Sequence, residues 1–196
     1  MPARDKSPST AVDRALSMLE ALAAVAAATG GPGLPSLLFS AFAAWGAEHS
    51  DSSSPLLTTV VHNRRRPAFR RTVGLLMDVI PVRTAPPSAP AMTFAERAKD
   101  LQSRVRACLR HHPSAVPPLA LEAQAFLFNF HLEQFRCEGG GIRAAQYWLP
   151  PREGVELLAL QVLDHAAENR LSLEFDLDAK VFAGREDETV VDFLGF

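Results

Sequence analysis

The sequence lacks most of the features that would place it in a specialised class of protein. It has only two cysteines, Cys108 and Cys137, among 196 residues, which excludes a disulfide framework. No uncharged stretch approaches the roughly 18 residues of a membrane-spanning helix, and the charged first residues lead into no signal-type apolar core. The formal net charge of −2 creates no field that would attract nucleic acid or a membrane surface. We therefore expect a cytoplasmic protein that binds neither.

Familiar cofactor and catalytic motifs are also absent from the sequence. It contains no glycine-rich phosphate loop after a strand, no Gly-x-Ser-x-Gly elbow, and no spacing of ligand residues typical of a metal site. Gly139–Gly141 opens no helix, so we interpret it as a turn. We predict no metal site and no cofactor bound directly by the chain.

What the chain does have is enough apolar mass for one core. Its residues are 47% hydrophobic and its length suits one domain, which should bury roughly 70% of its unfolded surface. We expect residues 1–9 to be disordered and residues 10–196 to form a single subdomain.

Periodicity and capping signals predict elements in the order ααββαβββα. Thr93 and Glu96 form a capping box that opens a long amphipathic helix. Two nearly continuous apolar runs are typical of strands in a sheet that is covered on both faces. The order favours an α/β two-layer sandwich with a mixed β-sheet. The expected helices span residues 10–29, 35–48, 93–112 and 185–193, and the expected strands span residues 57–62, 73–82, 125–132, 155–163 and 171–177.

One stretch has a more specific pattern. Residues 60–83 contain a β-branched run that ends in Asn63-Arg64, then a basic loop with a proline, then an apolar segment closed by Pro81-Val82-Arg83. This layout resembles the second half of the condensation domains of nonribosomal peptide synthetases. Phe126–Phe130 resembles the Phe-Asn strand of that family, and residues 171–182 resemble its closing Tyr-Asp-x-x-Leu-Phe segment.

The resemblance implies a chloramphenicol acetyltransferase-like half-domain from about residue 12 onward. The catalytic His-His-x-x-x-Asp-Gly signature of the family belongs to its first half and is not found here. The pair His111-His112 lacks the Asp and Gly of that signature, so we interpret it as a solvated helix end that complements the helix dipole. No catalytic residue is assigned to this chain apart from Asp78 as a candidate.

We therefore predict the C-terminal subunit of a split condensation-type acyltransferase. By resemblance, its active site is a tunnel between two similar halves, in which an acyl thioester on a carrier protein is converted into an amide or ester. The expected partners are a complementary N-terminal half-domain chain that supplies the catalytic His, or a second copy of this chain, and an acyl or peptidyl carrier protein with its phosphopantetheine arm. Two alternatives stay open: a non-catalytic scaffold that binds a carrier protein or an enzyme, and a cavity repurposed for another reaction in natural-product biosynthesis.

Three side chains are candidates for the lining of the substrate channel. Asp78 replaces the amide of the family's Val-Asn-Thr and lies in an apolar run, where an ionised carboxylate is costly without a partner. It orients an amine or the partner's His, or it is a strand-end or outward-facing Asp, or it anchors the sheet through an internal pair with Arg83. Asn129 either borders the channel or belongs to the solvent side of an alternating strand. Asn63 ends the first strand of the motif.

The loop between the two apolar runs is strongly basic. Its arginines either form a solvated loop or bind the phosphate of phosphopantetheine or an acidic helix of the carrier protein. Because no other stretch of the chain is comparably basic, nucleic acid is not an expected partner. The arginines are Arg64, Arg65, Arg66, Arg70 and Arg71.

Overall fold

The computed structural model describes residues 22, 24, 33–50, 55–62, 67–73, 76–84, 92–111, 126–132, 138–139, 142–143, 156–165 and 170–196. Residues 1–9, which are predicted to be disordered, lie outside these ranges, and so do residues 63–66 and His112. Of the helix predicted over residues 10–29, only Leu22 and Ala24 are described, and both are helical. No helix in the described ranges is long and apolar enough to cross a membrane.

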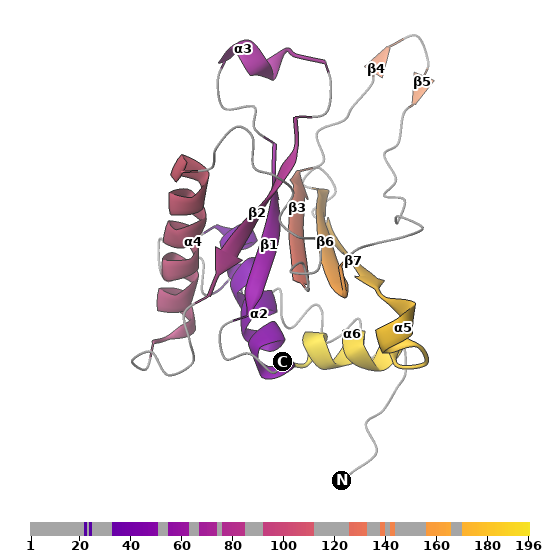
Figure 1. Ribbon diagram of the computed structural model, residues 1–196. Helices are drawn as coiled ribbons and strands as arrows, with labels where there is room; N and C mark the ends of the chain where they lie inside the picture. Colours follow the sequence, from indigo (N-terminus) through magenta and orange to yellow (C-terminus); the bar gives the residue numbers. More distant parts are fainter. Residues whose placement is uncertain are drawn as a thin grey trace.

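A five-stranded sheet forms one layer of the molecule, with the strand order β2-β1-β3-β6-β7 (Figure 1). β1 is parallel to β3 and β3 to β6, whereas β2 and β7 pair antiparallel with β1 and β6. The predicted mixed sheet is therefore confirmed. The strands are β1 (Leu56–Val61), β2 (Asp78–Arg83), β3 (Phe126–Leu132), β6 (Leu158–His165) and β7 (Arg170–Leu177).

Helices form the second layer. α2 (Leu34–Glu48) packs against β3 and against α4 (Phe94–His111), which also contacts β2. Phe39 of α2 stacks on Phe128 of β3 with ring centroids 4.7 Å apart, so α2 covers the face to which Phe128 points. The predicted two-layer sandwich is confirmed, and the predicted burial of α2 is confirmed by eight buried residues in its fifteen.

Aromatic rings fill the space between α2, β3 and α6 (Glu186–Leu194). Phe42 is fully buried, and its ring centroid lies 6.1 Å from that of Phe193 on α6 and 6.2 Å from that of Phe126 on β3. Asp192 of α6 accepts a hydrogen bond from Nε1 of Trp45 at 3.0 Å. Because the aromatic contacts join elements that are distant in the sequence, they hold the two layers together.

The capping box predicted for α4 is present. The backbone N–H of Thr93 donates to Glu96 Oε2 at 2.8 Å, and the backbone N–H of Glu96 donates to Thr93 Oγ1 at 3.3 Å. The bonds that the backbone N–H and the hydroxyl of Thr93 donate to the Glu96 carboxylate lower the pKa of Glu96, with a smaller contribution from the positive charge of Lys99. Two donors that would otherwise be unsatisfied at the helix start are thus satisfied reciprocally.

The second predicted strand is wrong at Val73, Leu76 and Met77, which are described and lie outside any strand. β2 begins at Asp78, which pairs with Val61 at the end of β1, whereas Val73 is 99% exposed. Apolar sequence forms a strand only where a neighbouring strand takes up its backbone hydrogen bonds, and β1 ends there. The preceding segment instead projects beyond the sheet and contains the short helix α3 (Pro67–Arg70), which the sequence did not predict (Figure 1).

Three further short elements complete the described structure. β4 (Glu138–Gly139) and β5 (Ile142–Arg143) pair antiparallel. Of the turn predicted at Gly139–Gly141, Gly139 is the last residue of β4 and the other two residues lie outside the described residues. The predicted C-terminal helix is present as α6. The four-residue helix α5 (Ala179–Phe182) precedes it and is capped by Asp178, which accepts a hydrogen bond from Lys180 N.

Candidate functional site

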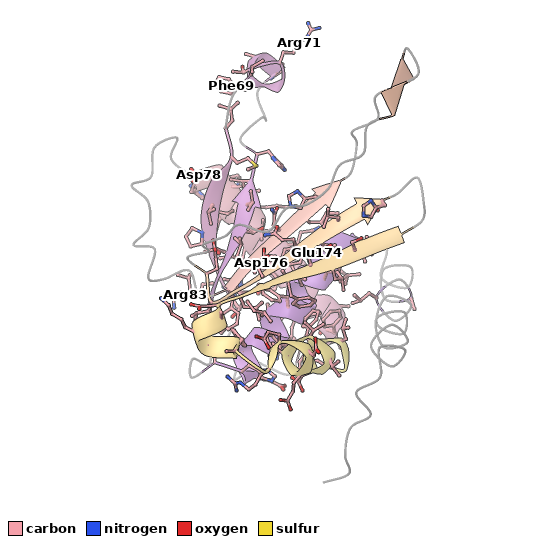
Figure 2. All side chains as sticks on the ribbon, turned by 90° about the vertical axis from the view of Figure 1, so that its right-hand side faces the viewer. Phe69, Arg71, Asp78, Arg83, Glu174 and Asp176 are labelled. Atoms are coloured by element: carbon pink, nitrogen blue, oxygen red, sulfur yellow. The ribbon has the colours of Figure 1, made fainter. Side chains whose placement is uncertain are left out.

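Polar side chains gather on the sheet face that points away from α2. Successive side chains of a strand point to opposite faces, so Asn129 points away from the face on which Phe128 meets α2. The strand register places Gln161 of β6 beside Asn129, and Glu174 of β7 beside Gln161. Figure 2 labels Glu174 and its neighbour on the same face, Asp176. We call the following residues the polar face: Asn129, His131, Gln161, Glu174 and Asp176.

Three amide and imidazole groups of the polar face lie within hydrogen-bonding distance. Asn129 and Gln161 are only 5% and 3% exposed, although both have polar side chains. Nδ2 of Asn129 lies 2.7 Å from Nε2 of His131, and the same Nε2 lies 3.3 Å from Oε1 of Gln161. Buried polar groups are costly unless they are hydrogen-bonded, and these contacts bring the three groups together across β3 and β6. One ring nitrogen cannot both accept from Nδ2 and donate to Oε1, so with these atoms only one of the two contacts is a hydrogen bond.

Asp176 extends this arrangement to β7. It shares a hydrogen bond with Gln161, while its Oδ2 atom is buried and has no hydrogen-bond partner. Burial raises the pKa of Asp176 above its usual range, against the opposing effect of the bond to Gln161. The nearby carboxylates of Glu174 and Glu156 raise this pKa further. Asp176 is therefore a carboxylate whose ionised form is poorly stabilised.

His131 is the titratable group at the other end of the arrangement. Burial lowers the pKa of its half-buried imidazole, the bond to Gln161 opposes the change, and His62 lowers the pKa further. His62 directly follows β1, the strand beside β3. The environment thus favours a neutral imidazole, the form that can accept a proton.

Asp78 lies on a different part of the molecule from Asn129. It pairs with Val61 at the start of β2 and shares a face with buried Ile80, which is the helix-covered face, and its Oδ1 accepts a hydrogen bond from Val79 N at 2.8 Å. Asn129 points to the opposite face. The structure therefore does not bring these two candidate channel residues together.

An ion pair between Asp78 and Arg83 is ruled out by the geometry of β2. The two residues begin and end the strand (Figure 2). At about 3.3 Å per residue, their Cα atoms are roughly 16 Å apart. Arg83 is exposed, and no ion pair joins it to another residue in the described ranges. The predicted pair with Asp78 is wrong because strand geometry separates its members.

The basic loop is only partly described. Asn63, Arg64, Arg65 and Arg66 fall outside the described ranges, and Arg70 is placed by its backbone in α3. Arg71 is exposed directly after α3, and Phe69 is 42% exposed on the same projecting segment (Figure 2). Their docking role stays a prediction.

Two other predicted features can be placed. His111 is exposed at the last position of α4, as expected for a solvated helix end. Within the described residues, no group of three or more His, Cys, Asp or Glu side chains is arranged to hold a metal ion.

A cavity of about 280 Å³ lies between α2 and α4, lined by Glu48, Arg97 and Asp100 among others. It is on the helical side, away from the polar face.

The sequence interpretation missed His131, Gln161 and Asp176. His131 could have been found from the alternation that singled out Asn129, since the two are two positions apart on one strand and therefore share a face. Gln161 and Asp176 are brought beside them only by the pairing of β3, β6 and β7. Strand order and register of this kind are not encoded in any local pattern.

Comparison with other proteins gives structural matches only. No protein-family model matches the sequence, and no curated protein sequence matches it. The first condensation domain of the CDA synthetase superimposes on 91% of this chain with a TM-score of 0.62 and 17% identity. The condensation domain that mediates chain release from the enacyloxin polyketide synthase matches 90% of the chain with a TM-score of 0.66 and 19% identity. The condensation domain of the monacolin K polyketide synthase MokA matches 96% with a TM-score of 0.65 and 15% identity.

These matches define the fold. The chain covers 42%, 37% and 44% of those three solved chains, so it spans about two fifths of their length. At such low identity the likeness concerns the arrangement of the backbone. The protein has the chloramphenicol acetyltransferase-like fold of condensation domains over the part that it matches.

Proposed function

We propose that this chain is the C-terminal subunit of a split condensation-type acyltransferase. It would form one wall of a tunnel in which an acyl thioester on a carrier protein reacts with an amine or an alcohol. A partner chain would supply the other wall and the catalytic His. The observation that carries the proposal is the match to condensation domains over about nine tenths of this chain and about two fifths of theirs.

The polar face supports the proposal as the tunnel wall. In the polar face, half-buried His131 and exposed Glu174 are the side chains that remain accessible to a substrate, whereas the amides of Asn129 and Gln161 are buried beneath them. Asn129 lies in this face. Asp78 lies on the other, so its proposed part is to orient groups of the partner at the strand end rather than to act beside Asn129.

The projecting segment between β1 and β2 supports the proposed docking of a carrier protein. Exposed Arg71 stands there beside exposed Phe69 and Val73. Arginine binds phosphates and carboxylates through paired, charge-assisted hydrogen bonds. The arginines of this loop would bind the phosphate of the phosphopantetheine arm or an acidic helix of the carrier.

The test begins with a search for the partner. A neighbouring reading frame should encode a chain with the His-His-x-x-x-Asp-Gly signature. The two chains are then purified together and separately, and their masses are measured by light scattering. Acyl transfer from an acyl-loaded carrier protein to a primary amine and to an alcohol is followed by mass spectrometry.

We expect no transfer by the isolated chain and measurable transfer by the complex. A stable monomer that neither binds the neighbouring product nor supports transfer would contradict the proposal. Association without transfer would instead support the non-catalytic scaffold.

A further inference from the structure

One face of α2 consists of small side chains where this helix meets α4. Its four residues recur at the spacing that places side chains on one face of a helix, and they leave open space that larger side chains would close. On the side of α4, Leu101 forms an apolar wall and is only 5% exposed. The result is the cavity of about 280 Å³ between the two helices. The small residues are Ser40, Ala43, Ala44 and Ala47.

Two charged side chains of opposite sign line this cavity from different helices. Arg97 lies in the first turn of α4 and is half-buried, whereas Glu48 is the last residue of α2 and is exposed. They do not pair with each other, and no ion pair joins either of them to another residue in the described ranges. Asp100 also lines the cavity, but it is paired with Arg104 at 2.6 Å. One positive and one negative group of the lining are therefore left to pair with a ligand.

Two buried hydroxyl groups also line the cavity. Ser40 is 5% exposed, and its Oγ donates its hydrogen to Ser36 O at 2.8 Å. A hydroxyl has one hydrogen and two lone pairs, so Ser40 can only accept a hydrogen bond from a molecule in the cavity. Thr84, directly after β2, is 8% exposed. The cavity thus offers a hydroxyl acceptor for an N–H donor in addition to the carboxylate of Glu48.

We propose that this cavity binds a free amino acid with a small apolar side chain, in its zwitterionic form. Arg97 holds the carboxylate through paired, charge-assisted hydrogen bonds. Glu48 and the hydroxyl of Ser40 accept hydrogen bonds from the ammonium group, and the apolar side chain lies against the alanines of α2 and against Leu101. A ligand with both charges fits better than a simple anion, because an anion would bring a second negative charge near Glu48.

The size and place of the cavity restrict the proposal further. Pockets for drug-sized molecules span roughly 300–1,000 Å³, and this cavity is slightly smaller. A single amino acid of the size of L-valine is therefore expected, rather than a peptide or a nucleotide. The cavity lies on the helical side of the sheet, so the site is separate from the polar face and does not depend on the proposed function.

The class of ligand is tested by isothermal titration calorimetry of the full chain with three compounds. L-valine carries both charges, isovalerate lacks the amine and isobutylamine lacks the carboxylate, while all three share the branched apolar part. We expect L-valine to bind at least about tenfold more tightly than the other two, because each of them lacks one charge-assisted contact. Failure of L-valine to bind with a Kd below about 10 mM, or equal affinity for either of the other compounds, would overturn the inference.

The residues of the site are tested by substitution. Arg97→Gln and Glu48→Gln should each weaken the binding of L-valine about tenfold or more, since each removes one charge-assisted contact. Arg97→Lys keeps the charge but loses the paired hydrogen bonds, so it should weaken binding less. Lys99→Gln is the matched control, because it removes a positive charge from an exposed position of α4 outside the cavity lining. It should leave the affinity unchanged.

A steric variant tests the position of the amino acid without any change of charge. Ala44→Leu places a larger side chain in the cavity and should abolish binding of L-valine. Thermal unfolding followed by circular dichroism shows whether each variant is folded, and exposed Glu48→Gln decides if Ala44→Leu is not. Unchanged affinity in the folded variants would mean that the amino acid binds elsewhere, and it would overturn the inference. Every measurement uses this chain alone, so the result is independent of whether a complex transfers acyl groups.

Discussion

At the scale of single residues, the carboxylate of Asp176 has one oxygen with a hydrogen-bond partner and one without. One oxygen has the bond to Gln161, whereas buried Oδ2 has no partner, and two glutamates stand nearby. The raised pKa means that the folded protein holds the proton of Asp176 more tightly than the unfolded chain does. Its contribution to stability is therefore full at acidic pH and is lost as pH rises through the raised pKa.

Asp176→Asn should accordingly raise the melting temperature at pH 7, because it removes a poorly stabilised charge and keeps an oxygen for Gln161. At pH 3, where Asp176 is protonated, the difference should shrink toward zero. Thermal unfolding followed by circular dichroism at both pH values measures this. Asp178→Asn is the matched control, since either residue can cap α5. A lower melting temperature for Asp176→Asn at pH 7 would show that the charge stabilises the fold.

Asp78 and Arg83 should act independently. Their separation along β2 means that the stability changes of Asp78→Asn and Arg83→Gln should add within about 0.5 kcal/mol in a double-mutant cycle. Asp78→Asn should itself be mild, because the amide oxygen can keep the bond to Val79 N. A coupling energy well above that limit would require contact between the two side chains. Lowered turnover of the complex without a lowered melting temperature would support a role for Asp78 in orienting the partner.

The candidate site shows which of its residues can be predicted from local sequence patterns. Alternation along one strand was enough to find Asn129, and the charge change at Asp78 was visible in the sequence. The hydrogen bonds that give Asn129 its neighbours depend on β6 and β7, which the chain brings alongside β3 through parallel and antiparallel pairing. Those neighbours depend on the register between strands that are distant in the sequence, and a local sequence pattern does not predict this register.

At the scale of elements, the clearest signals were chemical. The capping box of α4 was predicted from two residues and is present with both of its hydrogen bonds. The strand predicted over residues 73–82 was only half right, because apolar composition alone does not supply a pairing partner. Val73 is almost fully exposed for this reason, and Met77 is 48% exposed.

Thr93→Ala tests the contribution of the cap. Loss of a Thr cap costs about 0.5–2 kcal/mol, and 1 kcal/mol corresponds to about 2–4 °C in melting temperature for a chain of this length. Ser103→Ala, at an exposed position within the same helix, is the control and should be neutral or slightly stabilising. Equal effects of the two substitutions would mean that the capping bonds contribute nothing.

At the scale of the whole molecule, the two layers are joined by aromatic packing. Phe42→Ala should cost about 3–5 kcal/mol because it opens a cavity among the rings of α2, β3 and α6. Phe69→Ala is the matched control, since that ring is 42% exposed on the projecting segment and its loss should be nearly neutral. Denaturant unfolding of both variants measures the difference. Similar losses would mean that Phe69 is buried in solution.

The two edges of the sheet have unequal consequences for association. β2 contains Pro81, which has no N–H, so its outer edge is a poor template for another strand. β7 is eight residues long and contains no proline, and no strand in the described ranges pairs with its outer edge (Figure 1). An added strand should therefore extend the sheet at β7. Both productive assembly with another chain and misassembly between copies are directed to that side of the molecule.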